Sequence, residues 1–363
     1  MILKEIHIHN VRNIEKAKIE FGDHLNILYG ENGSGKSSVL ESIYLLSSGK
    51  SFRSRHITKI ITENKNKLTL FGKLSSKDKT TTLGIEKSSS GHIIHINGEG
   101  VKKVSALALS LPVLIVTQDS HKLLEAGPQW RRQFSDWGLF HVKHDFLLVW
   151  TSYRKLLKSR NQALLNKATR AEIDAWNEGL ASFGETYNIL RRDYINEICP
   201  WFKEYAQSLL GNHGCKSDFE LKYRQGWPKD INLYDCLKGQ YERDRISGRT
   251  PYGPHRADMI VNMNGRDAKD QASRGQQKLL VYALYLAQIA HLRKESGKET
   301  FLLLDDLGAE LDINHSLNLL KLISEQFSQV CMTTANLDSL PLDQFKEVKM
   351  FHVEHGKIQS VSH

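Results

Sequence analysis

The chain has 363 residues, more than one hydrophobic core usually organises, so we expect one large domain with a second lobe, or two domains. Its 50 Lys and Arg residues outnumber 41 Asp and Glu residues, and this formal charge of +9 favours an acidic partner without identifying it. The charged start of the chain and the lack of any apolar run of about 18 residues argue against export and membrane insertion, so we expect a cytoplasmic protein.

The first predicted elements are two antiparallel strands followed by a buried one. Apolar residues alternate from Ile2 to His9 and again from Ala17 to Phe21, with Arg12 and Asn13 in the turn between them. The apolar run from Leu25 to Tyr29 predicts the buried strand.

A phosphate-binding loop follows this strand. Its sequence fits the pattern GxxxxGK[ST] and leads into an apolar helix, a position that argues against a chance glycine-rich turn. Backbone N–H groups and the start of the helix would hold the phosphates, with Lys36 at the β- and γ-phosphates and Ser37 at a magnesium ion. The predicted nucleotide-binding residues here are Gly30, Glu31, Asn32, Gly33, Ser34, Gly35, Lys36, Ser37 and Ser38.

Short alternating segments separated by Gly, Ser or Lys clusters then predict a small β-meander, and another apolar strand follows it. These segments are Lys67 to Leu74, Thr80 to Glu86, Ile93 to Asn97 and the strand Leu111 to Thr117.

From about residue 122 to residue 210 the pattern changes to long helical periodicity with scattered basic residues. This insert is too short to hold a coiled-coil arm of hundreds of residues. Its basic residues include Arg154, Lys155, Lys158 and Arg160, which are candidates for contact with an acidic partner. An exposed basic face without a ligand explains such a run equally well.

Strands resume after Gly248, and Gln276 to Leu292 predicts one long helix with an apolar face. Phe301 to Leu304 then forms an apolar strand that ends in Asp305 and Asp306. In enzymes with a phosphate loop the first such acid binds magnesium, and a carboxylate beside it can orient or deprotonate the attacking water. A solvated acidic turn is the alternative, which the phosphate loop disfavours.

Several motifs occur in an order that resembles a known group of ATPases. Ser273 to Lys278 gives a Ser-x-Gly-Gln signature at a helix start, the acid pair follows, and residues 308–312 (Gly-Ala-Glu-Leu-Asp) come next. This order resembles the ATPase heads of the ABC and SMC group and, within it, the bacterial RecF family of recombination mediators. Further segments that carry the resemblance are Asn10 to Asn13, Gly49 to Arg53, Gly127 to Asp136 and Gly253 to Asp258.

The resemblance implies an α/β fold, an ABC/SMC-like ATPase head with a mixed sheet and flanking helices. A mainly helical lobe is inserted into it, and no long coiled coil is present. The implied domains are residues 1–117 (the part of the head with the phosphate loop), 118–252 (the helical insert) and 253–363 (the part with the signature and the acidic strand).

The resemblance also implies ATP and Mg²⁺ as cofactors and assigns the site. The implied catalytic residues are Asp306, Lys36 and Gln118, and the implied metal ligands are Ser37, Asp305 and Gln118. Arg12 and Asn13 are further nucleotide contacts, whereas Ser273, Gly275 and Gln276 act on the nucleotide that a second subunit holds.

In function, the resemblance implies an ATP-dependent homodimer that binds DNA, either duplex or a junction of single and double strands. We then expect the helical insert to supply much of the DNA contact, with Arg154, Lys155, Lys158 and Arg160 as the leading candidates. RecR is the implied partner, with RecO alongside and RecA downstream, where the protein promotes RecA loading at gaps and normal SOS inducibility. ATP hydrolysis would be weak, stimulated by DNA, and used as a switch.

Three positions depart from this pattern. Residues 117–120 (Thr-Gln-Asp-Ser) stand where the family shows Pro-Glu, which bears on Gln118 as the magnesium-sensing glutamine. No histidine lies near residues 331–334 (Cys-Met-Thr-Thr), and because threonine is a poor general base we expect slow hydrolysis. Gly308 and Ala309 lack the serine often found in that loop.

Two other classes of protein share part of this pattern. An ATP-driven ABC transport subunit has the phosphate loop, the signature and the acid pair, but is normally shorter and lacks a basic helical insert. In a small-molecule kinase the signature helix has no role. ATP hydrolysis measured with and without double-stranded DNA discriminates these classes from a DNA clamp.

The four cysteines, Cys199, Cys215, Cys236 and Cys331, contain no CxxC pair, so we expect free thiols in a reduced compartment. His213 beside Gly214 and Cys215 is too small a group to indicate a zinc site.

Overall fold

The structure, a computed structural model, describes residues 2–76, 79–211, 217–306, 313–337, 342, 345 and 347–361. The chain divides into two units. Unit 1 consists of Met1–Ser120 and Gly297–His363, and unit 2 is the intervening segment His121–Ser296. Unit 1 is therefore built from both ends of the chain.

The predicted domain boundaries end the helical insert at residue 252, whereas unit 2 continues to Ser296. Two contacts account for this difference. Strand β10 (Asp258–Met263) pairs with β9 (Phe219–Arg224), and helix α10 (Arg274–Ser296) packs against α6 (Arg170–Leu210). The assignment of residues 253–363 to one functional head stays a prediction.

Unit 1 contains two sheets. The first is antiparallel, in the order β2-β1-β4-β5-β6-β7. Its strands are β1 (Ile2–Val11), β2 (Ile14–Glu20), β4 (Lys67–Ser76), β5 (Lys79–Ser88), β6 (Gly91–Ile96) and β7 (Glu99–Gly100). The alternating segments predicted the opening hairpin and the meander correctly, because one face of each strand is buried against apolar side chains.

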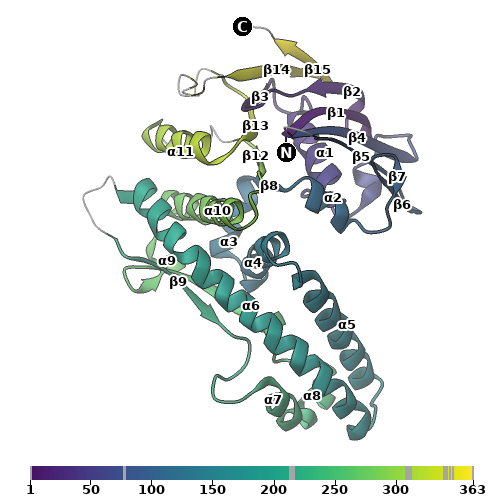
Figure 1. Cartoon of the computed structure of the whole chain (residues 1–363), viewed down its shortest axis with the longest axis vertical. Helices are drawn as coiled ribbons and strands as arrows, with labels where there is room; N and C mark the ends of the chain where they lie inside the picture. The colour runs from purple at the N-terminus through teal and green to yellow at the C-terminus, as the bar shows by residue number, and fades with distance from the viewer. Residues whose placement is uncertain are drawn as a thin grey trace. The chain divides into compact units, whose positions relative to one another are not determined.

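The second sheet has the order β15-β14-β3-β13-β12-β8 and is parallel from β14 to β8. Its strands are β3 (Leu25–Tyr29), β8 (Val113–Val116), β12 (Phe301–Leu304), β13 (Gln329–Thr334), β14 (Val348–Glu354) and β15 (Lys357–Val361). Figure 1 draws the C-terminal hairpin β14–β15 in yellow beside β3 and β2. The sequence analysis assigned no strand to β9, β13, β14 or β15.

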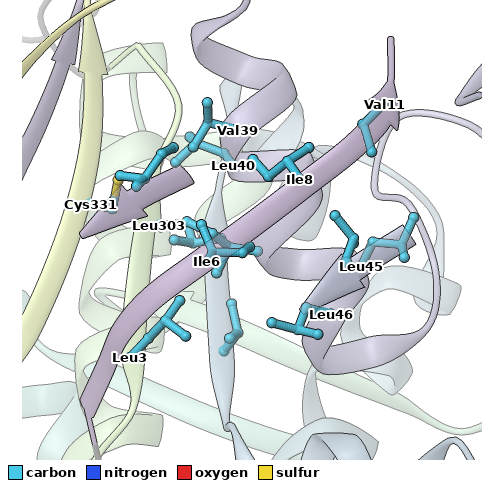
Figure 2. Packing of buried hydrophobic residues seen from close by; sticks show 14 of the residues in the cluster. Leu3, Ile6, Ile8, Val11, Val39, Leu40, Leu45, Leu46, Leu303 and Cys331 are labelled. Carbon is cyan, nitrogen blue, oxygen red and sulfur yellow. The ribbon is translucent and has the colours of Figure 1, made fainter. Parts of the chain in front are cut away.

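Helix α1 (Lys36–Ser48) packs against strands of both sheets and brings them into one hydrophobic core. Figure 2 shows Leu3, Ile6 and Ile8 of β1 gathered with Leu40 and Leu46 of the helix. Each such buried side chain stabilises the fold by roughly 1.5–3 kcal/mol. The pairing of β1 with β4 shifts register between Leu3 and Glu5, so Leu3 and Ile6 both face the core although their spacing breaks strict alternation.

The shorter elements of unit 1 connect these strands. They are the 3-10 turn Ile57–Lys59, helix α2 (Ser105–Ser110), the 3-10 turn Gln118–His121 at the border with unit 2, and helix α11 (Ile313–Gln326).

Unit 2 is mainly helical, and α6 is its longest element. This helix has 41 residues, which corresponds to about 60 Å, and begins with a capping box in which Thr169 and Glu172 bond reciprocally. Helix α5 (Phe146–Leu165) lies along it (Figure 1). The remaining elements are α3 (Lys122–Glu125), α4 (Pro128–Val142), α7 (Leu233–Gly239), α8 (Tyr241–Ser247), the 3-10 turn Pro254–Arg256, β11 (Arg266–Asp267) and α9 (Ala268–Gln271). The predicted change to long helices is confirmed, and the described residues of unit 2 form no long coiled coil.

The segments Gly127 to Asp136 and Gly253 to Asp258, which contributed to the family resemblance, are held together by the partly buried Arg131 and the buried Arg191. Arg131 places its Nε and Nη2 atoms 2.7 and 3.1 Å from the two carboxylate oxygens of Asp258. Arg191 of α6 donates to both oxygens of Asp136, at 2.9 and 3.0 Å, and to the Pro254 carbonyl. These contacts connect α4, α6 and the segment before β10, so the two motifs have a structural role in unit 2.

Arg160 was predicted to contact DNA, and this prediction is wrong because its side chain is completely buried. Its Nη1 lies 2.7 Å from a carboxylate oxygen of Asp244, which is also buried, and its Nε donates to Asn177 at 2.8 Å. Burial raises the pKa of Asp244, and the guanidinium of Arg160 opposes this rise. The pair therefore joins α5 to α8 inside unit 2.

Among the helices in the described ranges, none is both long and apolar enough to span a bilayer.

Replacing Arg160 by Ala should lower the free energy of unfolding by about 3 kcal/mol or more, because the Asp244 carboxylate would remain buried without its cation. Urea denaturation followed by circular dichroism measures this change. Arg154→Ala, on the exposed face of the same helix, is the matched control and should change the free energy by less than about 0.5 kcal/mol. Equal effects of the two substitutions would contradict the structural role of Arg160.

Candidate functional site

The parallel strands β3, β12 and β13 end at the same edge of the second sheet. Their register pairs Tyr29 with Thr334 and Leu304 with Met332. The segments that follow β3 and β12 therefore emerge at this edge on either side of the end of β13. They are the phosphate loop and the acid pair. Ligands of open parallel sheets bind at this edge, outside the carboxyl ends of the strands.

Two glycines of the phosphate loop have backbone conformations that a side chain would not allow. Gly30 has φ of 150°, and a Cβ atom there would lie 2.2 Å from the Val353 carbonyl oxygen. Gly35 has φ of 122°, and its Cβ would lie 3.0 Å from the amide nitrogen of Asn13. The glycines of the motif thus let the loop pass close to its neighbours.

Two hairpin turns support the loop from outside. The Asn13 amide nitrogen donates to the Ser34 carbonyl at 3.0 Å, and its amide oxygen accepts from the Ser38 hydroxyl at 3.1 Å. The Gly356 N–H, in the turn between β14 and β15, donates to the same Ser34 carbonyl at 2.8 Å. The position of the loop therefore depends on segments near both ends of the chain.

Lys36 begins α1, as the motif predicts. Its Nζ donates to the carbonyl oxygens of Gly30 and Glu31, at 2.7 and 2.8 Å, so the side chain folds back over the loop. Burial lowers the pKa of Lys36, and the nearby carboxylates of Asp306 and Asp305 oppose this shift.

Hydroxyl groups connect the acid pair to the loop and to β13. One Asp305 carboxylate oxygen accepts from the Ser37 hydroxyl at 2.8 Å and from the Thr333 hydroxyl at 2.9 Å. The Thr333 hydroxyl in turn accepts from the Asp306 N–H at 2.8 Å. The Gln118 amide nitrogen lies 3.4 Å from the Asp306 carboxylate, so Gln118 reaches this group from the end of β8.

These segments enclose a cavity of about 320 Å³ in unit 1. Its walls carry three cations and two carboxylates, a mixture that suits phosphates together with a divalent metal ion. The lining residues are Arg12, Asn13, Asn32, Gly33, Gly35, Lys36, Ser37, Ser38, Arg53, Asp305, Asp306 and Thr333. Most of the residues predicted for nucleotide and metal binding are thus brought together here.

The oxygen groups of Ser37 and Asp305 fit Mg²⁺, which takes few protein ligands and completes its shell with phosphates and water. In the described part of the chain no cluster of three or more His, Cys, Asp or Glu side chains forms a dedicated metal cage. His213 and Cys215, which are too small a group to indicate a zinc site, lie outside the described residues, as does the loop 308–312.

The signature residues belong to unit 2. Ser273 precedes α10, and its hydroxyl accepts from the Gln276 N–H at 3.3 Å while its own N–H donates to the Gln276 side chain at 2.9 Å. This is a capping box, so within one chain Ser273 and Gln276 stabilise the helix start. Ser273 and Gly275 are both exposed. Their action on a second subunit's nucleotide stays a prediction.

Of the predicted DNA contacts, Arg154, Lys155 and Lys158 are exposed on α5, a helix whose sequence contains no acidic residue. Arg154 stacks on Trp150, with 4.7 Å from the guanidinium carbon to the ring centroid. These three side chains are available to an anionic partner.

The sequence analysis missed three residues of this region. Arg53 lies in a segment that carried the resemblance, but no role was assigned to it. Thr333 was treated only as a poor replacement for a histidine, whereas it organises both acids. Glu41 is fully buried on α1, and the available signal was a carboxylate placed among Leu40 and Ile43 on an apolar helix.

Comparison with known proteins agrees with this geometry. A family model for the RecF/RecN/SMC N terminal domain matches residues 2–359. The chain is 37% identical over 355 residues to the DNA replication and repair protein RecF of Hydrogenovibrio crunogenus (strain DSM 25203 / XCL-2), covering 98% of each chain. It is 39% identical over 363 residues to the protein of the same name from Shewanella sediminis (strain HAW-EB3), covering 99% of each.

Solved structures show the same fold. A structure of the recombination mediator protein RecF with ATP, from the RecFOR pathway, matches with a TM-score of 0.87 at 25% identity, covering 99% of this chain and 98% of that one. An SMC head bound to the C-winged helix domain of ScpA matches with a TM-score of 0.60 at 16% identity, covering 100% and 98%. The predicted ABC/SMC-like head fold is confirmed.

The bridging hydroxyl of Thr333 generates a test. In Thr333→Val the Asp306 N–H loses its acceptor and Asp305 loses a donor, so we expect ATP hydrolysis to fall by about tenfold. Thr333→Ser keeps the hydroxyl and should retain most of the rate. Steady-state phosphate release with saturating ATP and Mg²⁺ measures both variants, and full activity of the valine variant would refute this role.

Proposed function

The chain belongs to the RecF/RecN/SMC family and, within it, to the RecF family, and from this premise we propose that it is an ATP-dependent clamp on DNA that serves DNA replication and repair. One observation carries the proposal. The phosphate loop and the acid pair, which are 268 positions apart at Ser37 and Asp305, are joined by a hydrogen bond of 2.8 Å at the wall of a charged cavity. This is the arrangement that phosphate-loop ATPases need.

ATP with Mg²⁺ is the proposed ligand of the cavity. Lys36 would hold the β- and γ-phosphates, Ser37 and Asp305 would hold the metal, and Asp306 with Gln118 would orient the attacking water. The RecF structure with ATP supports this choice of nucleotide. Bound Mg²⁺ would neutralise charge that develops on the phosphates.

ATP hydrolysis acts in this proposal as a timer. The proposed dimer holds a nucleotide at each of two sites, and Ser273, Gly275 and Gln276 of one subunit contact the γ-phosphate in the other. Loss of that phosphate removes the contact and separates the subunits. The absence of a histidine near Thr333 fits slow turnover.

In this proposal the protein is cytoplasmic and acts while bound to DNA at gaps that are being repaired. RecR would be the direct partner, RecO would act alongside, and the outcome would be RecA loading at gaps, recombination and SOS induction. The RecF structure with ATP, which comes from the RecFOR pathway, supports this part of the proposal. An ABC transport subunit is not favoured, because relatives that cover nearly the whole chain are named for DNA replication and repair.

The experiment that tests the function combines two measurements. ATP hydrolysis is compared with and without double-stranded DNA, and mass in solution is measured with ADP, ATP and DNA. A clamp should show stimulation by DNA and a dimer only with ATP. A monomer in ATP whose hydrolysis ignores DNA would exclude the clamp.

The signature contact generates a prediction in trans. Ser273→Arg should bind ATP as a monomer but neither dimerise nor hydrolyse it, since the arginine would obstruct the contact with the partner's phosphate. Mixed with Lys36→Ala, it should regain part of the ATPase rate, because one composite site would combine an intact Lys36 with an intact Ser273.

Ser273→Ala is the control for the helix cap alone and should cost about 1 kcal/mol of stability. If the mixture shows no recovery and Ser273→Arg still dimerises, the serine is only a cap and the trans contact does not exist.

The exposed basic face of α5 generates a second prediction. Replacing Arg154, Lys155 and Lys158 together by Ala should weaken DNA binding while ATP binding survives. The negative slope of log K against log salt should become smaller in magnitude by about 2 to 3, because three phosphate contacts are lost. Fluorescence anisotropy with a labelled duplex at several salt concentrations measures the slope. The matched control replaces the exposed Lys203, Lys229 and Lys238 by Ala, with the same change of charge. An equal loss in both variants would show that only net charge matters.

A further inference from the structure

Glu41 is an acidic residue whose side chain has no access to solvent. It lies on α1, the helix that begins with Lys36 and Ser37, and its side chain is completely buried. Glu41 has no role in the proposed hydrolysis of ATP. Burying a carboxylate is costly unless it is paired, so its partners indicate what it does.

The main partner of Glu41 is Arg12, in the turn between β1 and β2. Nε and Nη2 of Arg12 each lie 2.8 Å from a different oxygen of the carboxylate, which is a two-pronged pair of charge-assisted hydrogen bonds. The third nitrogen, Nη1, donates to the Lys59 carbonyl, and the Arg12 backbone N–H donates to the Ile60 carbonyl at 2.7 Å. The guanidinium is thus fixed in one orientation, and Arg12 lines the cavity.

The same carboxylate also holds the segment that carries Arg53. The Ser51 hydroxyl donates to Glu41, and its oxygen accepts from the backbone N–H groups of Arg53 and Ser54, each at 2.9 Å. Nη1 of Arg53 lies 4.0 Å from Glu41, and Arg53 also lines the cavity. One buried group therefore connects both arginines of the cavity wall.

We infer that Glu41 is a positioning residue, whose carboxylate orients Arg12 and, through Ser51, the segment of Arg53. Both guanidinium groups then point toward the phosphate-binding part of the cavity before ATP enters it. The inference rests on the proposed binding of ATP. Glu41 itself touches no phosphate in this arrangement and acts through the arginines. Side chains that are already oriented bind a ligand more tightly, because they lose less conformational entropy when the ligand binds.

The direction in which ATP affinity changes when Glu41 loses its charge distinguishes a positioning role from simple neutralisation of the arginines. A carboxylate near the phosphates repels them, so if Glu41 only balanced the arginines, removing its charge would strengthen ATP binding. If it positions them, the same change weakens ATP binding. The hydrogen bonds that Arg12 donates to Glu41 raise the pKa of Arg12. An arginine side chain keeps its charge without them as well, so Arg12 is a cation in both chains of the comparison.

The first test is Glu41→Gln, which keeps the shape of the side chain and removes its charge. Isothermal titration with ATP and Mg²⁺ should show binding about tenfold weaker than in the wild-type chain. Glu63→Gln, an exposed residue of the same unit, is the matched control and should bind as the wild type does. Equal or tighter binding by Glu41→Gln overturns the inference. If the wild-type chain binds no ATP, the proposed function itself fails.

A double-mutant cycle shows whether Glu41 acts through Arg12. The variant with both Arg12→Gln and Glu41→Gln should bind ATP within about twofold of Arg12→Gln alone. Arg12 is already absent from both variants, and the side-chain oxygen of the glutamine can still accept from the Ser51 hydroxyl, which keeps the Arg53 segment in place. Losses that multiply would mean that Glu41 acts independently, and would overturn the inference.

Ser51→Ala provides a variant that leaves the buried ion pair intact, for the case in which Glu41→Gln does not fold. It removes the hydroxyl between Glu41 and the Arg53 segment. A cooperative thermal transition only a few degrees below that of the wild type should show that the variant folds. We expect ATP binding about threefold to fivefold weaker. Unchanged binding in a folded Ser51→Ala would remove the Arg53 part of the inference.

Discussion

The parallel alignment of β3, β13 and β12 is the constraint on which the candidate site depends. Because the three strands run in the same direction and end in register, the phosphate loop, the acid pair and Thr333 meet at one edge of the sheet. Residues from opposite ends of the chain supply this sheet, and the hairpin after β14 supports the loop through the Gly356 N–H. The site therefore forms only when the chain returns to complete unit 1.

Paired buried charges serve two different purposes in this protein. In unit 2 the pairs of Arg160 with Asp244 and of Arg191 with Asp136 connect helices. In unit 1 the pair of Arg12 with Glu41 lies at the cavity wall, where the orientation of a guanidinium matters to a phosphate ligand. The same physical rule, that a buried charge requires a partner, thus stabilises the fold in one unit and shapes a site in the other.

Small hydroxyl side chains make the connections that charges alone do not. Ser37 and Thr333 each use one oxygen to connect distant segments to the acid pair, whereas the Ser273 hydroxyl caps the start of α10. A hydroxyl both donates and accepts, so it can connect a carboxylate to a backbone N–H without adding charge. The helix-capping bonds of Ser273 are compatible with a second contact in a dimer, because its side chain remains exposed.

The sequence by itself determined those features that depend on neighbouring residues. The phosphate loop follows from eight consecutive positions, the opening strands and the meander from alternation, and the acid pair from an apolar run that ends in carboxylates. The order of these motifs was enough to identify the family. Only the tertiary structure decided that Arg160 is buried, that Glu41 holds Arg12, and that Thr333 bridges the two acids. Each of these facts depends on which distant segments meet, and a basic residue on a helix has the same local pattern whether its face meets solvent or a buried carboxylate.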